Sequence, residues 1–156
     1  MVFMSTSDNT TPQVLAHSGV SNPLRILTTG ADGDTMSVGA ETNNYTHTIS
    51  ESGMMQGFLA FLNIASSTAG TTGTITCKIK RNGQTLTALT TDVSTFLAVS
   101  PVGIMFYDTL NFLAGAELIA GETFQLNIES NLIANPMTFD AKINIVYKPI
   151  ARSYTA

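Results

Sequence analysis

The sequence predicts an all-β protein, folded as a single jelly-roll β-sandwich of about eight strands with an extended N-terminal arm. Segments 74–80, 123–129 and 139–148 alternate apolar and polar residues, and an Asn-Gly dipeptide follows the first of them. Turn signals recur about every 8–15 residues, a spacing typical of sandwiches. At 156 residues the chain has the size of one domain with one core.

The clearest strand pair surrounds Asn82-Gly83. Before this dipeptide, Ile75, Cys77 and Ile79 recur at every second position and are expected to share one apolar face. Asn-Gly tolerates the positive φ angles of a two-residue hairpin turn, so residues 84–89 are expected to return as the partner strand.

Residues 1–22 are interpreted as the arm and residues 23–156 as the sandwich domain. The arm is polar, rich in Ser, Thr and Asn, and its short apolar segment contains Val14 and Leu15. Segments of this kind become ordered when another surface holds them. We therefore expect the arm to reach a neighbouring subunit.

The remaining elements follow from local patterns. The apolar run 54–65 is assigned to a central strand buried on both faces, because it lacks the spacing of an amphipathic helix, which is the rival assignment. A turn is expected over 30–34, where glycine and aspartate gather. Short strands are expected at 24–28, 45–50, 92–100 and 104–108, and longer alternating ones at 124–129 and 139–148.

Charged residues are scarce. They make up 12% of the chain, whereas soluble domains average about 25%. This indicates either a membrane protein or a surface that partners cover. The longest apolar run, residues 54–65, is shorter than the about 20 residues that a spanning helix needs. We therefore expect no membrane association and a surface covered by other proteins.

A nucleic-acid partner is not expected. The net charge is −4, and phosphate contacts need clustered Lys and Arg. The one local basic group, Lys78, Lys80 and Arg81, is interpreted as a solvated strand end. Glu117 and Glu122 are likewise interpreted as carboxylates that solvate a loop.

No catalytic or metal-binding arrangement is visible, so we expect no enzyme activity and no cofactor. His17, His47 and Cys77 cannot by themselves supply a zinc site. Asp32-Gly33-Asp34 is similar to the start of a calcium loop, but the twelfth position is Asn43 where glutamate is needed. Neither a nucleophile elbow nor a phosphate-binding glycine loop occurs. The N-terminus shows no secretion signal, which favours a protein made in a reducing cytosol.

Two short motifs resemble those of the tumour necrosis factor-like and complement-globular jelly rolls. In both, an alternating strand ends in Asn-Gly, here residues 80–83, and a later Gly-Asp/Glu turn leads into another alternating strand, here residues 120–126. The same layout is found in trimeric jelly-roll proteins of tailed bacteriophages, including head decoration (cement) proteins and fibre tips. The resemblance extends over residues 57–147. The chain departs from the animal proteins in its few aromatic residues and missing secretion signal, which favours the phage proteins.

The resemblance implies a structural virion protein, made in the host cytoplasm, that forms a homotrimer. It would stabilise a phage head as a capsid decoration or cement protein by bridging subunits of the major capsid protein. A receptor- or glycan-binding tip module of a fibre or baseplate is the alternative. The candidate partner-interface residues are apolar, with packing in the monomer core as the alternative for each: Val14, Leu15, Phe58, Phe61, Ile64, Met105 and Tyr107.

Overall fold

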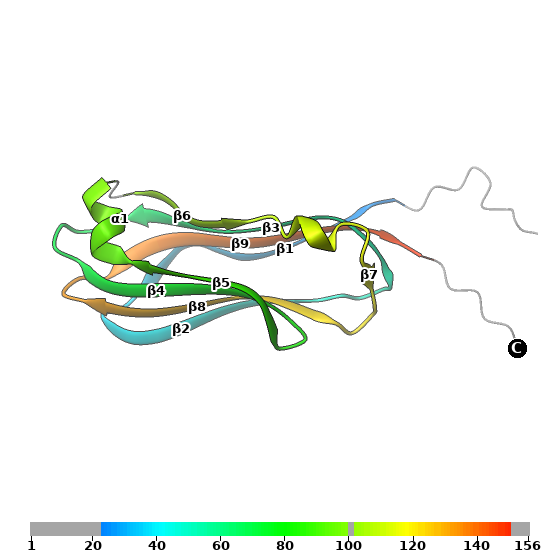
Figure 1. The fold of residues 1–156 in the computed structure, drawn as a ribbon, viewed down its shortest axis with the longest axis horizontal. Helices are drawn as coiled ribbons and strands as arrows, with labels where there is room; N and C mark the ends of the chain where they lie inside the picture. The colour runs from blue at the N-terminus through cyan, green and yellow to red at the C-terminus, as the bar shows by residue number, and fades with distance from the viewer. Residues whose placement is uncertain (1–22, 100–101, 151–156) are drawn as a thin grey trace, which may run out of the picture.

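The computed structural model describes residues 23–99 and 102–150, so the predicted arm lies outside the described residues. The described chain forms two antiparallel sheets packed face to face, with a short helix at one end (Figure 1). The elements are β1 (Arg25–Met36), β2 (Gly39–Thr48), β3 (Gly53–Ser66), β4 (Thr72–Arg81), β5 (Gln84–Asp92), α1 (Val93–Val99), β6 (Gly103–Asp108), the 3-10 helix η2 (Asn111–Leu113), β7 (Glu117–Leu118), β8 (Thr123–Ile133) and β9 (Met137–Pro149).

The strand order is that of a jelly roll. One sheet has the order β1-β9-β3-β6, with the two-residue β7 paired to β3, and the other has the order β2-β8-β4-β5. The last strand, β9, therefore lies between β1 and β3, and β8 lies between β2 and β4. Eight main strands in two sheets with this Greek-key order define the fold, and the predicted fold class is confirmed.

The core fills the space between the two sheets. Every second residue of β9, from Phe139 to Tyr147, points inward and is fully buried. The rings of Phe58 on β3 and Phe124 on β8 pack with centroids 5.9 Å apart and connect the sheets. Burying one such side chain contributes about 1.5–3 kcal/mol, so the alternating strands supply most of the stability of the sandwich.

The predicted hairpin is confirmed. Asn82 and Gly83 connect β4 to β5 with φ angles of 50° and 81°, the left-handed pair that a two-residue hairpin turn requires. The pairing begins directly beside the turn, where Arg81 lies opposite Gln84. The dipeptide therefore sets the register next to the turn, and a shift between Ile79 and Lys80 sets it for the rest of the pair.

The turn predicted over residues 30–34 is wrong. β1 continues to Met36, and the glycine-rich segment is a bulge at which the register with β9 shifts between Ala31 and Asp34. Gly30 fits only because it has no side chain: a Cβ there would lie 1.9 Å from the carbonyl oxygen of Ala141. The same glycines that are typical of a chain reversal here allow a strand to bend while it stays in the sheet.

The strand predicted over 92–100 is also wrong, because residues 93–99 form α1. The backbone N–H of Ser94 donates to the Asp92 carboxylate at 3.0 Å, so Asp92 satisfies a donor that the first turn leaves free. Val93 is buried, and Phe96 and Leu97 pack against the core at the three- and four-residue spacing of a helix. Capping and packing together outweigh the strand preference of the β-branched residues in this segment.

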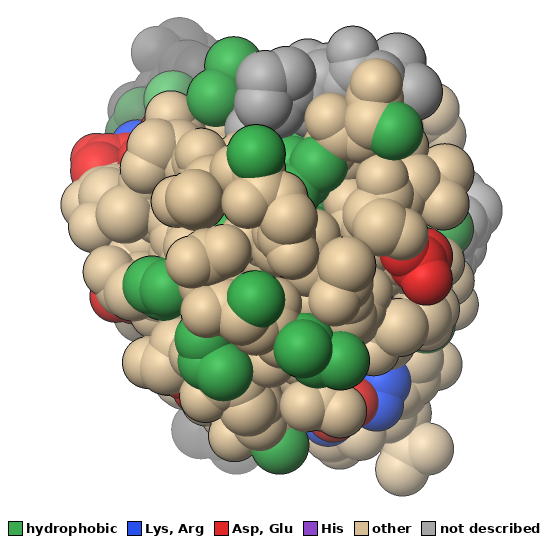
Figure 2. All heavy atoms as spheres, turned by 90° about the vertical axis from the view of Figure 1, so that its left-hand side faces the viewer, with side chains coloured by type: hydrophobic (Ala, Val, Ile, Leu, Met, Phe, Trp, Pro, Cys, Tyr) green, Lys and Arg blue, Asp and Glu red, His purple; other side chains and the backbone are tan. Residues whose placement is uncertain are grey.

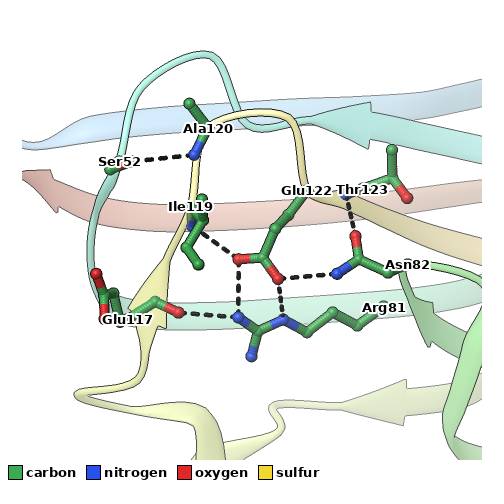
Figure 3. Close-up of polar contacts among 8 residues, drawn as sticks. All are labelled: Ser52, Arg81, Asn82, Glu117, Ile119, Ala120, Glu122 and Thr123. Atoms are coloured by element: carbon green, nitrogen blue, oxygen red, sulfur yellow. Dashed lines mark hydrogen bonds and ion pairs between the residues drawn. The ribbon is translucent and has the colours of Figure 1, made fainter.

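A polar cluster fastens the β4–β5 hairpin to the turn before β8 (Figure 3). The Arg81 guanidinium donates from Nε and Nη2 to the two carboxylate oxygens of Glu122, both at 2.8 Å. Asn82 Nδ2 donates to the same carboxylate at 2.9 Å, and its Oδ1 accepts the backbone N–H of Thr123 at 2.9 Å. Glu122 also accepts the backbone N–H of Ile119 at 2.7 Å.

This cluster corrects the interpretation of Arg81 and Glu122 as solvating groups. Their side chains are only 24% and 12% exposed, and each neutralises the other. The more open pair is Lys78 and Glu129, whose charged atoms lie 2.9 Å apart. The two short motifs noted in the sequence, residues 80–83 and 120–126, are thus in direct contact.

Candidate interaction surface

The two sheets present outer faces of different chemistry. The outer face of the β2-β8-β4-β5 sheet is polar, with threonine and amide side chains in neighbouring strands. Two hydrogen bonds of 2.9 Å, between the hydroxyls of Thr76 and Thr90 and from Gln125 to Thr46, satisfy part of it internally. Such a face can remain exposed to water and needs no protein partner to cover it.

The outer face of the β1-β9-β3-β6 sheet carries an apolar patch on β3 and β6, beside polar side chains on β9. The register places its side chains in rows that cross the strands in the order β1, β9, β3, β6. The exposed fraction of Ile26 is 70%, and that of Ile104 and Tyr107 is 60% each. The successive rows are Ile26, Val146 and Gly57; Thr28, Asn144 and Leu59; Gly30, Lys142, Phe61 and Tyr107; and Asp140, Asn63 and Ile104.

A groove of about 460 Å³ runs across this face. Four apolar or aromatic side chains and four polar ones line it: Leu59, Phe61, Ile104, Tyr107, Asp32, Asn63, Asp140 and Lys142. The volume lies within the range of about 300–1,000 Å³ that small-molecule sites occupy. The groove can therefore accept either a small ligand or the side chains of another protein.

The polar side chains of the groove satisfy one another at one side of it. Lys142 Nζ lies 2.6 Å from the Asp32 carboxylate. Asp140 accepts the backbone N–H of Gly33 at 2.8 Å and the Asn63 amide at 3.3 Å. The Lys142–Asp32 pair neutralises two of the three charges of the groove, and Asp140 keeps its negative charge while it accepts two neutral donors.

The structure divides the predicted interface residues between the core and this face. Phe61 and Tyr107 lie opposite each other on β3 and β6 and both line the groove. Phe58, Ile64 and Met105 are buried in the sandwich core. Residues 57–64 of β3 alternate without interruption, so their spacing alone separates Phe58 and Ile64 from Phe61. In β6 the register shift leaves Met105 without a partner on β3, and spacing could not show that it is buried.

The remaining two predicted residues, Val14 and Leu15, lie outside the described residues. Sequence reasoning missed Leu59 and Val146 as parts of the same outer face. Leu59 stands in the doubly apolar run that indicated a two-sided strand, and Val146 interrupts the polar side of β9. Both are signals of an apolar outer face, but only the strand order shows that they are neighbours.

The end of the sandwich that carries α1 is also poor in charge (Figure 2). Hydrophobic side chains are scattered over a mostly uncharged surface there, and the charged groups lie mainly towards its rim. Val38 and Ile133, which flank the β1–β2 and β8–β9 connections, are 52% and 60% exposed. The low charge of the composition is therefore visible at this end as well.

The titratable groups with shifted pKa values are not gathered at the groove. Burial raises the pKa of Cys77 to about 12 and lowers the pKa of His47. Among residues 23–99 and 102–150, no group of three or more His, Cys, Asp or Glu side chains is arranged to bind a metal ion. In the same residues, no helix has the length and apolar character needed to cross a membrane.

No protein-family model matches the sequence, and no curated protein matches it. Among solved structures, the chain is similar to a chain of the IBDV viral particle, with 13% identity and a TM-score of 0.41 over 82% of this chain and 32% of that one. It is similar to dimeric latent PorU from Porphyromonas gingivalis, with 10% identity and a TM-score of 0.43 over 83% of this chain and 13% of that one.

A third similar structure is that of Desmodium yellow mottle tymovirus, with 11% identity and a TM-score of 0.41 over 94% of this chain and 100% of that one. The chain spans less than half of the IBDV and PorU chains. At these identities and TM-scores the similarities carry no argument about function. The jelly-roll assignment rests on the strand order of this chain.

Proposed function

We propose that this chain is a structural virion protein, a capsid decoration or cement protein that stabilises a phage head by bridging shell subunits. The observation that carries the proposal is the apolar outer face of the β1-β9-β3-β6 sheet, beside a polar outer face on the other sheet. A sandwich that acts alone in water gains nothing from exposed Ile26, Ile104 and Tyr107. Contiguous exposed apolar surface of this kind marks a protein-contact site.

The composition supports the same function. With 12% charged residues, the chain has about half the usual solubilising charge, so its surface is suited to burial in a large assembly. A protein of this kind works by burying surface across its neighbours, and each buried Å² of apolar surface contributes about 25 cal/mol. It needs no turnover and no cofactor.

Binding to capsid shells tests the proposal. Shells of the virus whose genome carries this gene are assembled without the protein, mixed with increasing amounts of it, and sedimented. We expect saturable co-sedimentation and shells that withstand a higher temperature before releasing their contents. Shells that neither bind the protein nor gain heat resistance would contradict the proposal.

A second candidate function is supported by the groove. A binding module at a fibre or baseplate tip would need aromatic surface beside convergent polar groups, and Tyr107 and Phe61 lie beside Asp140 and Asn63 in this groove. An aromatic ring can pack against the apolar face of a sugar while carboxylate and amide groups bind its hydroxyls. Isothermal titration with host surface glycans, compared between the natural chain and Tyr107→Ala, would show whether the groove binds sugar.

A further inference from the structure

We infer that the outer face of the β1-β9-β3-β6 sheet binds the same face of a second copy of this chain, about a two-fold axis that runs parallel to the strands between β9 and β3. The inference rests on the proposed function, because that function requires this face to be covered in an assembly. It assigns the cover to a second copy and leaves contact with the shell to the other surfaces of the pair. It differs from the trimer that the sequence resemblance implies. The two can be distinguished by counting the copies.

The first argument is that two rows of this face have bulky side chains at one end and small ones at the other. In the rows of Leu59 and Phe61 the bulky side chains come from β3 and β6, where Leu59, Phe61 and Tyr107 project. On the β1 side, the same rows carry Thr28 and Gly30. Gly30 is required there because the carbonyl oxygen of Ala141 occupies the position where a Cβ would be. The absence of a side chain at this position is therefore a fixed feature of the fold.

A two-fold axis between β9 and β3 reverses the order of each row on the second copy. The row Gly30, Lys142, Phe61, Tyr107 then meets the same row read backwards. The partner's Tyr107 lies over Gly30, and the partner's Phe61 lies over Lys142. A large ring therefore meets a position without a side chain, and a second ring meets an ammonium group, which aromatic faces attract.

Two of the three other rows are complementary under the same operation, and in the row of Thr28, Asn144 and Leu59 the partner's Leu59 lies over Asn144. In the row of Asp140, Asn63 and Ile104, the partner's Asn63 lies over Asp140, so an amide donor meets a carboxylate. In the row of Ile26, Val146 and Gly57, the partner's Val146 lies over Gly57, where a Cβ would have no neighbour closer than 3.9 Å. One symmetry operation thus pairs large with small residues and donors with acceptors, as an isologous contact requires.

The size of the face fits a stable pair. β3 has 14 residues and pairs along its length with β9. β1, β9 and β6 have 12, 13 and 6 residues. At about 3.3 Å per residue and 4.8 Å per strand, the four strands together cover on the order of 700 Å² per partner. Stable interfaces bury about 800 Å² per partner. Two sheets packed face to face at about 10 Å would bury this area with interdigitating side chains, as inside a sandwich.

Analytical ultracentrifugation of the isolated chain is the first test. We expect two copies at micromolar concentration, and at least a 100-fold weaker association for Phe61→Asp and for Tyr107→Asp. Ile133→Asp is the matched control, because Ile133 is 60% exposed like Tyr107 but lies on the β2-β8-β4-β5 sheet. It should leave the pair intact. Far-UV circular dichroism and melting curves verify that each variant is folded.

Cross-linking supplies a readout that does not depend on removing an apolar residue. Asn63→Cys places a thiol beside the inferred axis, and Thr90→Cys places one on the opposite outer face, while the native Cys77 is buried. A short bismaleimide should link Asn63→Cys into dimers and leave Thr90→Cys monomeric.

Three results would overturn the inference. They are a monomer at all concentrations, a trimer, or a dimer that Phe61→Asp and Tyr107→Asp leave unchanged. A monomer that binds shells, with binding lost in Tyr107→Asp, would assign the face to the shell protein and keep the proposed function. A two-copy chain that binds no shells would keep the inference and contradict the proposed function.

Discussion

Arg81 at the end of β4 and Glu122 in the turn before β8 are joined by two parallel hydrogen bonds of 2.8 Å (Figure 3). The two residues are 41 positions apart in the chain. Arg81 directly precedes the hairpin turn and Glu122 lies in the β7–β8 connection, so the pair fixes the β4–β5 hairpin against that connection. Bidentate bonds between a guanidinium and a carboxylate are the strongest form of ion pair, and partial burial protects this one from water.

Replacing Glu122 with glutamine should lower the free energy of unfolding by about 2 kcal/mol, because Arg81 is left partly buried without its counter-charge. Urea denaturation followed by circular dichroism measures the change. The matched control is Glu129→Gln, since the Lys78–Glu129 pair is more exposed and should cost less than about 1 kcal/mol. Equal losses in the two variants would show that burial of the Arg81 pair adds nothing.

The same carboxylate should make stability depend on pH in the acid range. The hydrogen bond from Arg81 lowers the pKa of Glu122 below the 4.5 of an unperturbed glutamate. A depressed folded-state pKa gives stability that is complete above the unfolded pKa and is lost as pH falls through the folded one. The stability difference between the natural chain and Glu122→Gln should therefore be constant at neutral pH and shrink below about pH 4.5. A difference that does not change down to pH 3 would contradict this expectation.

Substitution by alanine should reduce the stability of the protein strongly at Gly30 and hardly at all at Gly57. A Cβ at Gly30 would lie 1.9 Å from the Ala141 carbonyl oxygen, so Gly30→Ala must separate β1 from β9 and should cost more than about 2 kcal/mol. At Gly57 the nearest atom to a new Cβ is 3.9 Å away, so Gly57→Ala should change stability by less than about 0.5 kcal/mol. Thermal melting of each variant and of the natural chain measures the two changes in stability.

Two tyrosines allow a matched test of a buried hydroxyl. The side chain of Tyr147 is fully buried and its hydroxyl has no hydrogen-bond partner, so Tyr147→Phe should be neutral or stabilising by up to about 1 kcal/mol. The Tyr45 hydroxyl donates to Asp34 at 2.9 Å, and Tyr45→Phe should cost about 1 kcal/mol. Chemical denaturation of both variants measures the change in the free energy of unfolding. A decrease for Tyr147→Phe as large as that for Tyr45→Phe would refute the assignment of an unpaired hydroxyl.

Cys77 should be inert in the folded protein. Burial raises the pKa of its thiol to about 12 and also excludes reagents, so the reactive thiolate is absent at neutral pH. Treatment with a chromogenic disulfide reagent should give modification at the rate of unfolding in buffer and immediate modification in concentrated urea. Immediate reaction in buffer would show that β4 opens far more readily than its position between β5 and β8 suggests.

Local patterns were sufficient where one signal dominated. Asn82-Gly83 predicted the hairpin because few other sequences adopt its φ angles, and the alternation from Phe139 to Tyr147 predicted a strand with one buried face. The glycines near residue 30 were misleading, since a bulge and a turn need the same backbone freedom and differ only in whether β9 is present alongside. Val93 prefers strands, but the cap at Asp92 and packing against the core stabilise a helix there.

The sequence by itself determined the fold class, the hairpin, the alternating strands and the shortage of charge, because these depend on neighbours within a few residues or on composition. Tertiary structure decided which side of each strand faces water. It brought Phe61 beside Tyr107, buried Phe58 and Ile64, and paired Arg81 with Glu122. These relationships depend on strand order and on the register of β3 with β9 and β6, and both are set by contacts between segments distant in the chain. The apolar outer face is therefore a property of the assembled sheet.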